Sequence, residues 1–402
     1  MNDDRRVDRL SAMRPSAIRE IHDLYQQLRQ KNPSRSFIPL HFGQPDRGTP
    51  PFIIEAACTA LREGAVFYEN NSGRVDLKEA LAIHHGRRLG IDLHPDHFVV
   101  TCGGTQAIAL ATLALLAPGD QVVAVTPSWP NLIESARIAG ATVHEMPLSF
   151  HEQARVFELD FNRLAQVVDR LDHLRLIIVN SPSNPTGWVI SNAQQNTLLE
   201  LCEKRACYLL SDEIYDRIVF CNPPFRSALS APGAARMQDR LILINGFSKT
   251  YCMTGWRIGY LIAEPALAAK MARMQEFLAS CAPSMAQVAA IVALRDGEPF
   301  IAESLERYRA LRSLALEGLG NLPGVTVARP DGTFYLFFRA TGSQDSIPFC
   351  KDLMIQTGVI LAPGNAFAAG SEGWLRLCFA AEADQLEEAI ARIGQFMIKK
   401  EH

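Results

Sequence analysis

The sequence predicts an α/β protein with a large domain, built on a mostly parallel, seven-stranded-type sheet between helices, and a smaller α+β domain. From about residue 96 to residue 262, short β-rich runs alternate with helical runs, which is the pattern of repeated strand–helix–strand units. After about residue 264 long helical runs take over, and further short strand-like runs follow them. A length of 402 residues is enough for two hydrophobic cores.

We expect three parts along the chain. They are an N-terminal arm that joins the small domain (1–45), a large domain (46–295) and a small C-terminal domain (296–402). Within the arm, residues 11–31 predict an amphipathic helix that Pro33 ends. The apolar residues that recur there at helical spacing are Ile18, Ile21, Leu24, Tyr25 and Leu28.

The large domain is expected to begin with two helices, over residues 52–63 and 75–88. Its strands are expected at residues 97–101, 121–125, 142–146, 174–179, 207–210, 240–244 and 256–262. Its further helices are expected at residues 107–116, 130–139, 160–171, 192–205, 264–280 and 285–295. In such a sheet ligands bind at the carboxyl ends of the strands, so the residues there are the first candidates for a site.

The small domain is expected to open with a long helix over residues 298–320. An antiparallel set of strands is expected to follow, at residues 325–327 and 334–338. Two more strands are expected at residues 359–361 and 374–379. Helices over residues 348–357 and 383–398 complete it.

The composition is that of a soluble globular protein, with 48% apolar and 21% charged residues. A net charge of −3 gives no overall attraction to nucleic acid or to an anionic membrane. The sequence has no apolar run of about 18 residues and no apolar signal segment at its start, so we expect no membrane span and a cytoplasmic protein. Nine cysteines without a Cys-x-x-Cys motif predict reduced thiols, and the two close histidine groupings lack a third ligand, so no metal site is expected.

Four predicted strand ends finish in glycine or polar residues, which is the main positional indication of an active site. The residues at these ends are Gly103, Gly104 and Thr105, then Asn184, then Asp212, and finally Lys249. Lys249 lies in an apolar and aromatic setting, where desolvation lowers the pKa of an ammonium group and favours the neutral amine that attacks carbonyls. Arg257, eight residues later, either lowers that pKa further or binds a phosphate. The alternative is a solvated lysine at a strand end.

The other candidates also have two interpretations each. Gly103, Gly104 and Thr105 stand between a strand and a helix, which suits either an anion site or a plain tight turn. Trp129 follows a strand and is placed either to stack on a flat ring or to pack.

Asp212 is either a partner for a protonated ring nitrogen or a cap of a turn. Tyr215 either donates to a phenolate-type oxygen or packs. Asn184 either binds a ring hydroxyl or serves the turn that follows it. A lysine, an anion site, an aspartate and a stacking aromatic are together the parts that hold pyridoxal phosphate.

These motifs resemble those of the class I/II aminotransferases, which are pyridoxal-phosphate enzymes of fold type I. The resemblance runs over almost the whole chain, from about Met13 to the last helix. The segments that carry it are residues 181–187, 211–215, 248–250, 255–260 and 374–380.

The resemblance implies a role for each candidate. Lys249 forms the internal aldimine and then moves the substrate's α-proton, while Asp212 keeps the ring nitrogen protonated. Arg376 binds the substrate α-carboxylate bidentately, beside the backbone of Gly43. The residues implied to bind substrate are Gly43, Trp129, Asn184 and Arg376. The residues implied to bind the cofactor, besides Lys249 and Asp212, are Gly103, Gly104, Thr105, Trp129, Asn184, Tyr215, Ser248 and Arg257.

Tyr68 matches the family tyrosine that reaches the phosphate of a neighbouring subunit, so a homodimer is implied. The sequence departs from many members of the family at two positions, with Gly246 where a serine phosphate ligand is frequent and Cys378 where serine or asparagine is frequent. Thr105 stands where a dicarboxylate-specific subgroup has lysine, and no arginine lies between Met274 and Ala293 to replace it. We therefore expect transamination between a 2-oxo acid and an α-amino acid with a non-acidic side chain.

Two alternatives remain open from the sequence. A lyase or synthase of the same fold, which eliminates a β- or γ-substituent as a C–S lyase does, has the same cofactor motifs. A non-catalytic regulator is the least favoured, because only about 40 residues precede Gly43, too few for a winged helix.

Overall fold

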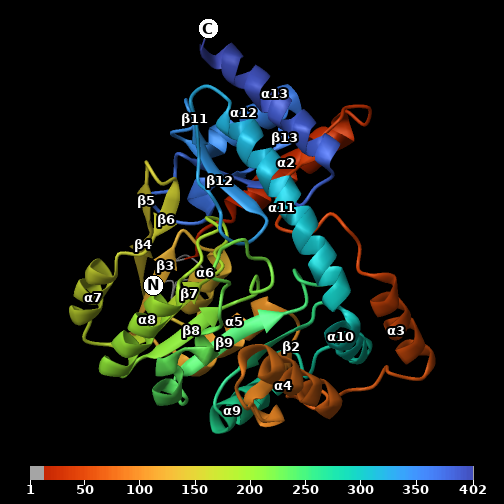
Figure 1. The fold of residues 1–402 in the computed structure, drawn as a ribbon, viewed down its shortest axis with the longest axis vertical. Coiled ribbons are helices and arrows are strands. Elements are labelled where there is room, and N and C mark those ends of the chain that lie inside the picture. The colour runs from red at the N-terminus through yellow and green to blue at the C-terminus, as the bar shows by residue number, and fades with distance from the viewer. Residues whose placement is uncertain (1–12, 402) are drawn as a thin grey trace, which may run out of the picture.

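A computed structural model describes residues 13–401, so the first two residues of the helix expected over 11–31 lie outside the described part. Its central feature is a seven-stranded sheet, which fills the lower half of the view in Figure 1. In order across the sheet, its strands are β2 (Phe98–Thr101), β10 (Gly259–Ile262), β9 (Leu241–Gly246), β8 (Tyr208–Asp212), β7 (Leu174–Asn180), β3 (Gln121–Thr126) and β4 (Thr142–Pro147). β10 pairs antiparallel with both of its neighbours and the other pairs are parallel, so the predicted fold class is confirmed.

Helices cover both faces of this sheet. They are α3 (Pro51–Arg62), α4 (Val75–Leu89), α5 (Gly104–Leu115), α6 (Pro130–Ile138), α7 (Phe161–Asp169), α8 (Asn192–Lys204), α9 (Pro265–Leu278) and α10 (Ser284–Asp296). Successive strand residues point to opposite faces. In β3, Val122 and Ala124 therefore pack in the same core as α5, α6 and α9, whereas Val123 and Val125 pack with α7 and α8.

A second, antiparallel sheet lies in the upper half of Figure 1. Its strands are β11 (Val325–Val327), β12 (Tyr335–Ala340), β15 (Trp374–Cys378) and β14 (Ala362–Pro363). The helices that pack around it are α2 (Ala17–Lys31), α11 (Glu298–Gly320), α12 (Ser346–Thr357) and α13 (Ala383–Glu401). α11 starts beside α10 and runs from the lower half of the view to the upper half (Figure 1).

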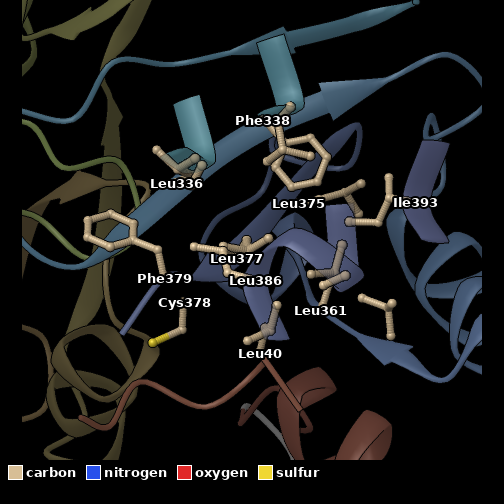
Figure 2. Packing of buried hydrophobic residues seen from close by; sticks show 14 of the residues in the cluster. Leu40, Leu336, Phe338, Leu361, Leu375, Leu377, Cys378, Phe379, Leu386 and Ile393 are labelled. Atoms are coloured by element: carbon tan, nitrogen blue, oxygen red, sulfur yellow. The ribbon is translucent and has the colours of Figure 1, made fainter. Parts of the chain in front are cut away.

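The core of this second sheet is visible in Figure 2, where Leu375 and Leu377 of β15 gather with Leu386 and Ile393 of α13. Leu40 joins this cluster from the segment after β1 (Ile38–Pro39), which pairs in parallel with β13 (Val359–Ile360). The chain before the large sheet is therefore held against the C-terminal part of the protein, and this places the residues around Gly43 near β15.

Two details differ from the sequence prediction. A hairpin of β5 (Ser149–His151) and β6 (Val156–Glu158) was not expected. The strand expected from residue 256 begins only at Gly259, because the preceding residues belong to the loop after β9 and Arg257 has a left-handed φ of 56°.

Short 3₁₀ segments cover Pro95–His97, Ala228–Ser230, Pro232–Met237 and Gly364–Ala366. In the described part of the chain, no helix combines the length and the apolar character needed to cross a bilayer.

Candidate active site

A cavity of about 940 Å³ opens where the carboxyl ends of the central strands face the second sheet. Most of the predicted site residues meet there, although they come from distant parts of the chain. The predicted residues that line the cavity are Gly43, Gly104, Thr105, Trp129, Asn184, Asp212, Tyr215, Ser248, Lys249, Arg257 and Arg376. Gly103 lies just behind the wall, and Tyr68 lies elsewhere, on the surface.

Lys249 follows the end of β9 and extends into the cavity. Its Nζ donates a hydrogen bond to the carbonyl oxygen of Gly43, at 2.6 Å. Burial lowers the pKa of this amine to about 8; Arg376 and Arg257 also lower it, while Cys378 and Asp212 oppose the shift. About a tenth of the lysine is therefore neutral at pH 7, far more than for an exposed lysine, and the solvated-lysine alternative does not fit this burial.

Asp212 ends β8 and is fully enclosed. Its Oδ1 accepts a hydrogen bond from the backbone amide of Ile214, at 3.2 Å. Burial raises the pKa of the carboxyl group to about 7, against the smaller lowering effects of this hydrogen bond and of Lys249. Among the side chains that the structure describes, none forms an ion pair with Asp212. A buried carboxylate without an ion-pair partner is suited to accept a hydrogen bond from a protonated nitrogen of a ligand.

Arg376 lies on β15 and is likewise buried. Its Nη1 donates to Oδ1 of Asn184 at 2.8 Å, and its Nη2 donates to the carbonyl oxygen of His41. The guanidinium contacts two aromatic rings, with Cζ 4.5 Å from the centroid of Tyr335 and 4.8 Å from that of Phe367. Its Nε is buried without a hydrogen-bond partner in the described chain. This held, positively charged fork is suited to bind a carboxylate.

Another part of the cavity wall has the geometry of an anion site. Gly103 has a φ of 82°, and α5 begins at the next residue, so the first amides of the helix face the cavity. The guanidinium of Arg257 lies against Gly103, where a Cβ would come within 2.5 Å of Nη2. Arg257 is held by hydrogen bonds to the carbonyl oxygens of Thr254, at 2.9 Å, and Cys102, at 3.3 Å.

Gly246, where the sequence lacks a possible phosphate hydroxyl, has a packing explanation. It pairs with Gly259 across β9 and β10, and a Cβ on Gly246 would lie 2.9 Å from the Cα of Gly259. A serine at this position would push the two strands apart. Ser248 remains in the cavity wall, and Cys378 is buried, with burial raising the pKa of its thiol to about 11. Cys378 therefore packs in this structure as an un-ionised thiol.

Trp129 caps α6 and Tyr215 follows β8, and both side chains line the cavity. The Oη of Tyr215 is 2.7 Å from the Oη of Tyr335, a residue that the sequence analysis did not select. Tyr335 stands in an aromatic run, residues 334–338, whose pattern indicates only a buried strand. The wall formed by residues 13–19 was also not predicted, because only the tertiary fold brings it here.

Taken together, the residues fit pyridoxal phosphate. The helix terminus with Arg257 suits the phosphate, Asp212 suits the ring nitrogen, and Lys249 suits the aldehyde carbon.

Comparison with known proteins gives the same answer. The family model for aminotransferase class I and II matches residues 35–393. The chain is 36% identical over 362 residues to the aspartate aminotransferase of Thermotoga maritima, covering 90% of this chain and 91% of that protein. It is 32% identical to the aromatic-amino-acid aminotransferase 2 of Thermococcus litoralis, over 98% of each.

A crystal structure of the Thermotoga maritima aspartate aminotransferase has the same fold, with a TM-score of 0.89 and 34% identity, covering 97% of this chain and 99% of that one. The sequence and structure matches therefore both extend over nearly the full length. The chain belongs to the class I and II aminotransferases and is a pyridoxal-phosphate-dependent transaminase.

Proposed function

We propose that this transaminase moves the amino group between a 2-oxo acid and an α-amino acid whose side chain is not acidic. When bound, pyridoxal phosphate supplies an electron sink for the electron pair left at the substrate α-carbon. Lys249 would take the α-proton of the substrate onto its Nζ and pass it to the bound cofactor, and in the second half-reaction it would make the same transfer in reverse. Its pKa of about 8 suits this task, because a base works best when its pKa is near the working pH.

The groups around Lys249 are proposed to hold the reactants. Asp212 keeps the ring nitrogen protonated, and Asn184 and Tyr215 hydrogen-bond the phenolic oxygen of the ring. Arg376 binds the α-carboxylate. These assignments are supported by the burial of each group and by the hydrogen bond that already joins Arg376 to Asn184.

The phosphate is proposed to lie at the start of α5. Gly103, Gly104 and Thr105 contribute backbone amides there, and Ser248 and Arg257 contribute side chains. Trp129 is proposed to stack on the ring and, with Gly43, to border the substrate.

The observation that carries the substrate proposal is the charge balance of the cavity wall. Thr105 presents a neutral side chain where a dicarboxylate-binding lysine was possible. Arg14 and Arg137 do line the wall, but both pair with Glu145, at 3.1 and 3.3 Å, and Arg137 also pairs with Glu134. Their charges are thus matched by carboxylates of the chain itself.

Apolar side chains make up much of the remaining wall. They include Ile18, Phe42, Ile133 and Ile347. The names of the relatives do not choose a substrate, since they range from aspartate to aromatic amino acids. An apolar wall with balanced charges favours a neutral side chain, since an unmatched carboxylate there would lose its hydration without gaining a cation.

Arg19 is the basic residue of the wall that bears most directly against this proposal. It is exposed at the rim, with Cζ 5.4 Å from the ring centroid of Phe42. If Arg19 bound a distal carboxylate, aspartate and glutamate would become good substrates.

The test mixes the yellow holoenzyme with single amino acids and follows loss of its visible absorbance. We expect leucine, methionine and phenylalanine to react with kcat/KM at least about 10-fold above aspartate and glutamate. A preference for aspartate or glutamate that disappears in Arg19→Ala would reject the proposal and identify the cation responsible. Release of ammonia and a 2-oxo acid without an added acceptor would indicate elimination instead.

We further propose a homodimer in which Tyr68 acts in the partner's site. Tyr68 is 90% exposed and lies outside the cavity of its own chain. The loop that carries it is fixed to the end of α9, where Asn71 bonds to Glu276, and exposed Phe67 and Phe277 flank it. So much exposed apolar surface is typical of an interface.

Mixed dimers of Lys249→Ala and Tyr68→Ala chains test this arrangement. If Tyr68 acts across the interface, each mixed dimer contains one intact site, and activity returns to about half of the wild-type value per dimer. If the mixture stays as inactive as its two parents, Tyr68 acts within its own chain. If Tyr68→Ala alone keeps full activity, Tyr68 has no role in the site.

Two further proposals concern the chain as a whole. The arm (1–45) and the C-terminal part (296–402) are proposed to form one domain, because β1 pairs with β13. The cytoplasm is proposed as the location, because all nine cysteines are free thiols, as is usual in a reducing compartment.

A further inference from the structure

We propose that Tyr335 is a positioning residue that links Tyr215 to Arg376. Tyr215 is the proposed partner of the cofactor's phenolic oxygen, and Arg376 is that of the substrate's α-carboxylate. This inference rests on the roles proposed above for Tyr215 and Arg376. Tyr335 begins β12, is fully buried and does not line the cavity, so it acts on bound groups only through its neighbours.

The first contact of Tyr335 is with Tyr215. Their hydroxyl oxygens are 2.7 Å apart, which is the usual length of an O–H···O hydrogen bond. Burial raises the pKa of both phenols well above the ordinary value, so both hydroxyl groups keep their protons. Each of the two hydroxyl groups therefore carries one proton, and one of these two protons forms the hydrogen bond between the two oxygens. When Tyr335 is the donor, the proton of Tyr215 is free to point into the cavity.

This donor order strengthens Tyr215 as a hydrogen-bond donor. A hydroxyl group that accepts a hydrogen bond becomes a better donor, because a chain of hydrogen bonds polarises along its length. A stronger donor to the phenolic oxygen lowers the basicity of that oxygen. The hydroxyl of Tyr335 is thus placed to tune the cofactor without touching it.

The second contact of Tyr335 is with Arg376. The guanidinium lies over the Tyr335 ring, with Cζ 4.5 Å from its centroid, and over the Phe367 ring, with Cζ 4.8 Å from its centroid. Stacking of this kind fixes the plane of the guanidinium fork, which decides whether a carboxylate meets two donors or one.

A third contact reaches the lysine. A Cβ on Gly43 would lie 1.9 Å from the Oη of Tyr335, so the hydroxyl is packed directly against that backbone. The carbonyl oxygen of the same Gly43 accepts the hydrogen bond from Lys249. Tyr335 therefore contacts Tyr215, Arg376 and Gly43. These are the residues next to the phenolic oxygen, the carboxylate and the amine of Lys249, respectively.

The test separates the hydroxyl from the ring by using Tyr335→Phe and Tyr335→Leu holoenzymes. In Tyr335→Phe we expect the pH midpoint of the visible band of the lysine-bound cofactor to rise by about 0.5 to 1, because the phenolic oxygen becomes more basic. We expect kcat to fall about 3- to 10-fold and KM for the amino acid to change less than about 2-fold. In Tyr335→Leu we expect KM to rise by a further factor of about 10, because Arg376 loses its stacking partner.

Tyr308→Phe is the matched control. Tyr308 belongs to the same buried cluster and also carries a buried hydroxyl, but it is not in contact with Tyr215 or Arg376 through any hydrogen bond or stacking in the described chain. Its substitution should leave the pH midpoint unchanged. An equal shift in Tyr308→Phe and Tyr335→Phe would overturn the inference, because the shift would then follow from any loosening of this core.

Tyr215→Phe distinguishes failure of the inference from failure of the proposed function. We expect a larger shift than in Tyr335→Phe, and the double variant should match Tyr215→Phe alone, since Tyr335 acts through Tyr215. If Tyr215→Phe shifts the midpoint and Tyr335→Phe does not, only the role of Tyr335 is wrong. If neither variant shifts it, the proposed role of Tyr215 is wrong, and this inference is wrong with it.

Discussion

The two ends of the cavity are built in different ways. At one end lie Asp212, the last residue of β8, and Arg376, in the middle of β15, and each is only 2% exposed. At the other end Arg14 belongs to the segment before α2, and its side chain is 51% exposed. The buried end carries the protein groups that transamination of every amino acid needs. The exposed end borders the substrate side chain, which differs from one amino acid to another. Rigid strands thus position the chemistry, and a peripheral segment borders the variable group.

The difference also concerns how strongly each end is held. At the buried end, hydrogen bonds in a low dielectric fix the groups, as the bonds from Arg376 to Asn184 and to the carbonyl oxygen of His41 do. At the exposed end, ion pairs such as Arg14–Glu145 are partly solvated and screened by salt. Substitutions at the buried end should therefore have large effects on all substrates, and those at the exposed end small effects on some.

Lys249→Ala should have the largest effect. Without this amine the α-proton has no base and the cofactor has no covalent attachment, so kcat should fall by at least about 10⁴-fold. The visible absorbance of the lysine-bound cofactor should disappear as well. An unchanged circular dichroism spectrum would show that the fold persists. Residual activity above about 1% of wild type would instead mean that another group moves the proton.

Arg376→Lys should be the next largest. The variant keeps the positive charge but loses the planar fork, so kcat/KM for every amino acid should fall by about 10²- to 10³-fold, mainly through KM. Arg19→Lys is the matched control at the exposed end and should change kcat/KM by less than about 3-fold. Equal losses in the two variants would remove the contrast between the two ends of the cavity.

Asp212→Asn should weaken cofactor binding by about 10²-fold, because a charge-assisted hydrogen bond becomes a neutral one.

In the cofactor-free protein the same substitution should be stabilising at pH 8. The folded-state pKa of Asp212 is raised from 3.8 to about 7, so the folded protein binds the extra proton and loses stability as pH rises through this window.

The gain in the free energy of unfolding for cofactor-free Asp212→Asn should be about 1 to 4 kcal/mol at pH 8 and should vanish near pH 4. Urea unfolding at the two pH values measures it. A variant that is less stable than wild type at pH 8 would show that the carboxylate has a stabilising partner in the cofactor-free protein.

Sequence reasoning succeeded at the buried end because strand ends can be recognised from local patterns. The β-rich run before Asp212 and the turn residues after Asn184 are visible in the sequence, and a parallel sheet must bring such ends together. The same reasoning expected an antiparallel set of strands from the pattern around β11 and β12, which the structure pairs in this way. What it could not provide was the pairing of side chains across the two sheets, such as Tyr215 with Tyr335.

The exposed end was not predicted, for a physical reason. Arg14 and Ile18 reach the cavity only because Leu40 and β1 anchor the N-terminal segment on the C-terminal part of the chain. That contact joins residues more than 300 positions apart, and no local pattern encodes it. Gly246 was likewise read as a missing ligand, whereas its close approach to Gly259 depends on strand pairing.

Thr105→Lys should have the smallest effect, and it tests whether an added cation in the cavity wall admits an acidic substrate. Thr105 is the first residue after the glycines of the anion site and lines the cavity, so a lysine there gives a distal carboxylate a cation that Glu134 and Glu145 do not already pair. An ion pair that remains accessible to solvent contributes about 1 kcal/mol, so kcat/KM for aspartate should rise by about 5- to 10-fold, and the gain should shrink in high salt. Thr105→Val, which adds no charge, should show no gain. If aspartate gains nothing from Thr105→Lys while leucine loses activity, the distal group of the substrate lies elsewhere in the cavity, and the exposed wall of Arg14 and its carboxylates selects the substrate instead.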